Sequence, residues 1–174
     1  MFGKKRRSEL EFFRRDAGGE FRYTGGYCRY AGKPTRTRQL ALLWTICGIG
    51  TLALIAAGCL SAPGMTGSTY VLIPYVAALI ALCAGLWALG RLTLGGDPIR
   101  ETDCACAESA PRRLAAAGVL SLLAMAGEGL YLLLHGTGEK PGAAAACVIL
   151  LAVSGISALL GKSRFRVLKW EKSS

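Results

Sequence analysis

The feature of this sequence that most constrains its fold is a long stretch without a single charged side chain. Between Leu40 and Gly90 there is no Asp, Glu, Lys or Arg. A soluble domain presents charged groups to water along most of its length, and about 25% of its residues are charged. Here the charged fraction is 18% and the hydrophobic fraction is 52%. The sequence therefore predicts an integral membrane protein.

Four segments are long and apolar enough to cross a bilayer. A helix needs about 20 apolar residues to span roughly 30 Å, because every backbone amide in lipid has to be hydrogen-bonded within the segment. We predict an all-α integral membrane protein with four transmembrane helices in two helical hairpins. The spans lie at about 40–60, 71–90, 114–134 and 143–160, within a membrane domain of residues 40–160.

The orientation follows from the distribution of Lys and Arg. The arm before the first span (1–39) contains 11 basic residues, the middle loop (91–113) contains 4 and the tail (161–174) contains 5, which leaves only Lys140 elsewhere. Basic segments are retained in the cytoplasm. We therefore expect a multi-pass protein of the cell membrane whose N- and C-termini and middle loop are cytoplasmic.

The basic arm is expected to lie against the anionic inner leaflet, which attracts each nearby basic residue by about 1 kcal/mol. It is either a solvated topology signal or a structured surface element. In the second case, residues 8–15 favour one or two helical turns, and the alternating runs beside Gly25 and Gly26 favour a short β-hairpin in which Phe21 faces Tyr30. The predicted lipid contacts are Lys4, Lys5, Arg6, Arg7, Arg14, Arg15, Arg36 and Arg38.

The middle loop has a helix-start signal and two close cysteines. Asp97 followed by Pro98 predicts a helix cap, and the short helix is expected to stop before Pro111. Cys104 and Cys106 are soft metal ligands, but a tetrahedral zinc site needs four ligands, and there is no second Cys or His cluster on the same side. We predict neither a metal site nor a cofactor.

Glu128 is the only ionisable side chain well inside a predicted span. At helical spacing it shares a face with Ser121, Tyr131 and His135, which gives a polar stripe that runs to the outer surface. Intramembrane carboxylates often mark proton or cation pathways. The alternative is a structural role, in which a protonated Glu128 is hydrogen-bonded to a Ser, Thr or carbonyl group on a neighbouring helix or contacts a partner subunit. We favour this role because the spans contain no second acid, Arg or Asn.

The sequence does not indicate an enzyme. It has no phosphate loop, no metalloprotease or hydrolase motif and only one His. Inner-leaflet lipid explains the basic arm without a nucleic-acid partner.

Small residues at spacings of four predict close helix packing, within the chain, in a homo-oligomer or with a protein partner. We expect an assembly, accessory or lipid-contacting component of a membrane complex; the alternative is a small oligomeric proton- or cation-coupled transporter or channel that uses Glu128.

Overall fold

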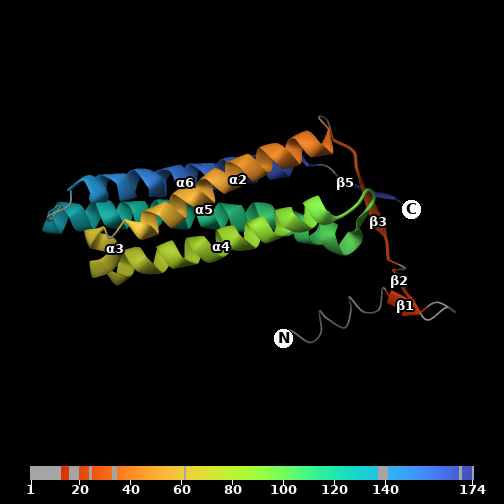
Figure 1. Cartoon of the computed structure of the whole chain (residues 1–174), viewed down its shortest axis with the longest axis horizontal. Helices are drawn as coiled ribbons and strands as arrows, with labels where there is room; N and C mark the ends of the chain where they lie inside the picture. The colour runs from red at the N-terminus through yellow and green to blue at the C-terminus, as the bar shows by residue number, and fades with distance from the viewer. Residues whose placement is uncertain are drawn as a thin grey trace.

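The chain is mostly helical, and its long helices lie side by side (Figure 1). The computed structural model describes residues 13–15, 20–23, 25–32, 35–60, 62–136, 141–168 and 170–173. Its long helices are α2 (Arg36–Cys59), α4 (Thr69–Leu94), α5 (Glu101–His135) and α6 (Pro141–Val167), and a short helix, α3 (Pro63–Gly67), connects α2 to α4. All four long helices have the length and composition to cross a membrane. The four predicted spans are thus confirmed as apolar helices.

Helix α5 lies at the centre of the bundle. It packs along both α4 and α6, whereas α2 packs mainly against α6. The buried faces meet in two apolar clusters, one near α3 around Leu54, Val71 and Leu151, and one at the opposite end around Leu89 and Leu114. Large apolar side chains also cover the outside of the bundle, as expected where the surrounding medium is hydrocarbon rather than water.

Two glycines make a close contact between α5 and α6. A Cβ on Gly118 in α5 would lie 3.1 Å from the carbonyl oxygen of Gly155 in α6, and a Cβ on Gly155 would lie 3.2 Å from the carbonyl oxygen of Gly118. Only residues without a side chain allow two backbones to come this near. At this point the predicted tight packing occurs within one chain.

Short strands form two sheets. β1 (Phe13–Arg15) pairs antiparallel with β2 (Phe21–Tyr23). The second sheet has the order β4-β3-β5, with β3 (Tyr27–Tyr30) between β4 (Ile99–Arg100) and β5 (Trp170–Ser173). In Figure 1, β3 and β5 lie at the end of the bundle opposite α3. The arm, the middle loop and the tail therefore meet in one structure, which we call the sheet end.

The predicted β-hairpin around Gly25 and Gly26 is wrong in its pairing. Residues 21–23 and 27–30 are strands, but β2 pairs with β1, and β3 pairs with β4 and β5. The proposed helical turns are also wrong for residues 13–15, which form β1, while residues 8–12 lie outside the described part of the chain. The local alternation identified the strands correctly, but it contains no information about distant segments that bury Cys28.

The predicted short helix in the middle loop is also corrected. Asp97 and Pro98 precede β4 instead of capping a helix, and α5 begins at Glu101 and continues through Pro111 into the membrane span. Proline removes one backbone hydrogen bond and disfavours a helix interior by about 3 kcal/mol. Burial on both sides of Pro111 offsets that loss, because Ala107, Ala110 and Leu114 form one continuous face in the core.

Candidate functional sites

Glu128 connects α5 to the short helix at the far end of the bundle. Its side chain is fully buried, and its Oε1 accepts a hydrogen bond of 3.1 Å from the backbone N–H of Gly64. Gly64 is the second residue of α3, which begins with Pro63 and has no side-chain cap of its own. The first amides of a helix have no partner within it. The Glu128 carboxyl group provides that partner from another helix.

The space around this carboxyl group is filled. A Cβ on Gly64 would overlap it, so the carboxyl group would have to shift to admit any larger residue at that position of α3. The backbone of Met65 also faces the carboxyl group. The second oxygen, Oε2, is buried and has no hydrogen bond of good geometry to any described residue. One oxygen is thus used structurally, and the other is a buried polar atom without a hydrogen bond of good geometry in the described part of the chain.

The polar stripe predicted on α5 divides into separate contacts. Tyr131 lies over α3, where a Cβ on Gly67 would be 2.9 Å from its hydroxyl oxygen. His135 is exposed and stacks on Tyr131 with ring centroids 4.5 Å apart. Ser121 faces α6 instead, and its Oγ lies 3.5 Å from the Oγ of Ser154. The structure therefore places Glu128 and Tyr131 of α5 against the short helix α3. Ser121 does not join them, because it pairs with Ser154 of α6.

The partner of Glu128 was missed in the sequence. Residues 61–68 lie between the predicted spans 40–60 and 71–90, and no helix is predicted there, whereas the structure has α3. The available signal was Pro63, because proline is common at the first position of a helix. The pairing with Glu128 joins two residues far apart in the chain, so no local pattern contains it.

The sheet end has a packed interior. Cys28 of β3 and Ile99 of β4 pair in the sheet, and both are buried against the end of the bundle. The thiol of Cys28 lies within hydrogen-bonding reach of Cys104, which is buried on α5. On the tail side, Tyr30 and Trp170 make an edge-to-face contact with ring centroids 5.5 Å apart. These contacts anchor the sheet on the bundle.

One arginine of the arm closes the end of α4. Arg36 donates hydrogen bonds to the carbonyl oxygens of Leu92, Gly95 and Gly96, two of them at 2.6 Å. The last carbonyls of a helix lack partners and carry partial negative charge, so a cation stabilises them. Of the predicted lipid contacts, only Arg36 and Arg38 have described side chains; Arg38 is exposed and Arg36 is partly buried.

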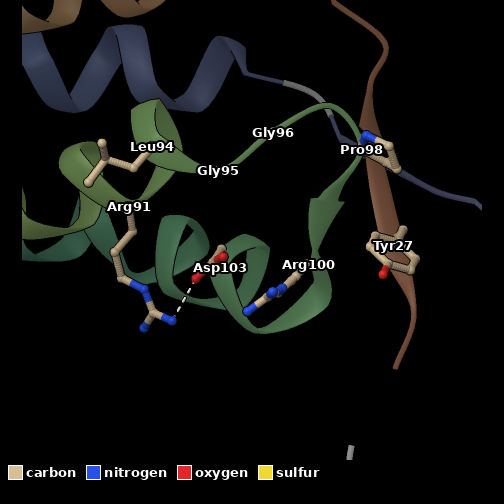
Figure 2. Close-up of a pocket in the computed structure, with 8 residues that line it drawn as sticks. All are labelled: Tyr27, Arg91, Leu94, Gly95, Gly96, Pro98, Arg100 and Asp103. Carbon is tan, nitrogen blue, oxygen red and sulfur yellow. Dashed lines mark ion pairs between the residues drawn. The ribbon is translucent and has the colours of Figure 1, made fainter. Parts of the chain in front are cut away.

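A polar pocket of about 520 Å³ opens beside this helix end (Figure 2). Arg91 of α4 and Asp103 of α5 form an ion pair there at 2.6 Å. Arg100 extends from β4 toward Asp103 from the other side, so the acid lies between two arginines in Figure 2. The polar pocket is lined by Tyr27, Arg91, Leu94, Gly95, Gly96, Pro98, Arg100 and Asp103.

Comparison of the chain with protein-family models, with curated proteins and with solved structures found no match.

Proposed function

We propose that this protein is a non-catalytic multi-pass component of a membrane complex, with an assembly, accessory or lipid-contacting role. In this proposal it resides in the cell membrane with both termini and residues 91–113 in the cytoplasm. The observation that carries the proposal is the β4-β3-β5 sheet. It joins the three segments that contain 20 of the 21 basic residues into one surface.

The folded arrangement of that surface supports a docking role. A sheet assembled from the arm, the middle loop and the tail holds these segments in a fixed arrangement, whereas a topology signal alone needs no folded structure. Among the described residues, its edge strand β5 pairs only with β3. An open strand edge is a common way to bind an extended segment of another protein.

A pull-down from mild detergent tests this function. The tagged full-length chain is compared with Trp170→Ala, which removes the aromatic contact to Tyr30, and with Arg112→Gln, which changes an exposed residue of α5 away from the sheet. We expect wild type and Arg112→Gln to recover the same partner in stoichiometric amount, and Trp170→Ala to lose it while remaining folded in the membrane. Recovery of nothing beyond what an unrelated four-span protein recovers would contradict the proposal.

A second function is supported by one observation, the buried Oε2 of Glu128 without a hydrogen bond to a described residue. Such an atom suits a protonatable or cation-binding carboxyl group in a transporter or channel. Under this proposal, Glu128→Gln abolishes proton-coupled flux in liposomes, because an amide does not exchange a proton in this way. If the reconstituted wild-type protein shows no flux above that of empty liposomes, the transport function is excluded under those conditions.

A further inference from the structure

The end of α4 is bordered by two adjoining hollows of opposite character. One is the polar pocket described above. The other is an apolar groove of about 340 Å³, lined by Trp44, Cys83, Leu86, Trp87, Gly90, Arg91 and Leu94. Arg91 and Leu94 line both hollows, so the two adjoin at these side chains. A ligand that fits both has a charged head and an apolar tail.

The charge of the polar pocket selects an anionic head. Its lining contains two arginines and one acid. Arg91 uses only Nη2 in its ion pair with Asp103, and its other nitrogens make no hydrogen bond to a described residue. Its side chain is 38% exposed. A guanidinium group with free donors fits the oxygen atoms of a phosphate.

The groove runs along α4 from Arg91 toward the middle of the helix, the direction that an acyl chain follows from its headgroup. Along α4, Trp87 precedes Arg91 by one helical turn and Cys83 precedes it by two, which places them about 6 and 12 Å toward the middle of the helix. Trp87 is 68% exposed and Leu94 is 90% exposed. Trp44 is fixed by a hydrogen bond of 2.9 Å from its indole N–H to the hydroxyl of Thr93. Exposed tryptophans of this kind mark the level of the headgroups.

We propose that the polar pocket and the apolar groove together bind one anionic phospholipid. Its phosphate lies at Arg91 and Arg100, and one acyl chain follows α4 past Trp87. The proposal rests on the lipid-contacting part of the proposed function but not on a protein partner. It also differs from attraction of the basic arm to the leaflet, because it assigns a single site with a defined lipid.

Fluorescence quenching by brominated phospholipids tests the proposal. The full-length chain with Trp170→Phe, whose remaining tryptophans both line the groove, is reconstituted in vesicles that mix phosphatidylglycerol and phosphatidylcholine, with bromine on the acyl chains of one or the other. We expect stronger quenching by the anionic lipid than its mole fraction predicts. In the same background, Arg91→Gln is expected to lower this preference about fivefold, the effect of one basic residue near an anionic surface.

Two further variants separate binding from structure and from general charge. Asp103→Asn breaks the same ion pair as Arg91→Gln but frees the arginine, so we expect it to keep or strengthen the anionic preference. Arg112→Gln removes an exposed charge outside both hollows and is expected to leave the preference unchanged. A loss in Asp103→Asn equal to that in Arg91→Gln, or an equal loss in Arg112→Gln, would overturn the proposal.

The source of the phosphate is decided by competition. Inorganic phosphate added to the vesicles is expected to leave the quenching unchanged, because the site gains much of its affinity from the acyl chain in the groove. Release of the brominated lipid by phosphate would show a simple anion site and would overturn the lipid assignment. These outcomes do not depend on the pull-down, so the two proposals fail separately.

Discussion

At the scale of single residues, the most informative contact is that between Glu128 and Gly64. A carboxyl group in the apolar interior is tolerated when it satisfies a backbone group that is otherwise unpaired. Glu128 does so for the first turn of α3, and the glycine allows the close approach. The isolation of Glu128 among apolar residues predicts a structural hydrogen bond to a Ser, Thr or carbonyl group, whereas the observed bond is accepted from a backbone amide.

Substitutions at Glu128 test its structural hydrogen bond to Gly64. Glu128→Gln keeps an oxygen that accepts from the Gly64 N–H, so we expect the thermal stability in detergent to remain close to wild type. Glu128→Ala leaves a buried N–H unpaired, which lowers the free energy of unfolding by about 1–3 kcal/mol. Thermal denaturation followed by circular dichroism measures both. Equal destabilisation by Gln and Ala would contradict the assigned hydrogen bond.

A glycine substitution tests the same contact from the other side. Gly64→Ala places a methyl group against the carboxyl group of Glu128, and overpacking of this kind lowers the free energy of unfolding by about 1–3 kcal/mol. Gly129→Ala is the matched control, because its Cβ would meet nothing within 4 Å. The control should be neutral or slightly stabilising, since alanine favours helix over glycine. A stable Gly64→Ala protein would refute the close approach.

At the scale of elements, the long helices were predictable and their ends were not. The four spans follow from hydropathy and length alone. A short helix before Pro111 was predicted, but its continuation into the third span was missed because Pro111 is a local stop signal, whereas the continuous buried face from Cys104 to Leu114 is a tertiary property. Similarly, β5 forms from Trp170–Ser173, which has no distinctive pattern and becomes a strand by pairing with β3.

The crossing of α5 and α6 gives a prediction at this scale. Gly118→Ala brings a Cβ within 3.1 Å of the Gly155 carbonyl oxygen and within 2.8 Å of the Leu159 side chain, so the two helices have to separate. We expect a loss of about 1–3 kcal/mol in the free energy of unfolding, measured by thermal denaturation in detergent. Gly129→Ala on the same helix again serves as the control. Full stability of Gly118→Ala would show that α5 and α6 do not meet here.

At the scale of the whole molecule, the two ends of the bundle differ in kind. In Figure 1, α3 lies at one end, and β3 and β5 lie at the other. Glu128 contacts α3 at the first end, and the polar pocket opens beside the β4-β3-β5 sheet at the second. The basic residues of the arm, the loop and the tail predict that all three lie on one side of the membrane. The sheet is consistent with that grouping because it joins all three, although their pairing depends on long-range contacts that charge does not specify.

Cysteine labelling in intact cells tests the orientation. In a background without native cysteines, Thr66→Cys and Asp97→Cys place exposed thiols at opposite ends of the bundle. If the sheet end is cytoplasmic, a membrane-impermeant maleimide labels Thr66→Cys in intact cells and labels Asp97→Cys only after the membrane is opened. The reverse pattern would invert the proposed topology.

The pairing of β3 with β5 also has a consequence for biosynthesis. Tyr27 precedes all four long helices in the chain, and its partner Ser173 follows them. The central strand therefore waits, paired on one side at most, until all four helices and the β5 segment have been synthesised. A nascent chain arrested before residue 170 has every membrane span but an unfinished sheet, so the completed sheet marks molecules in which all four spans have been made.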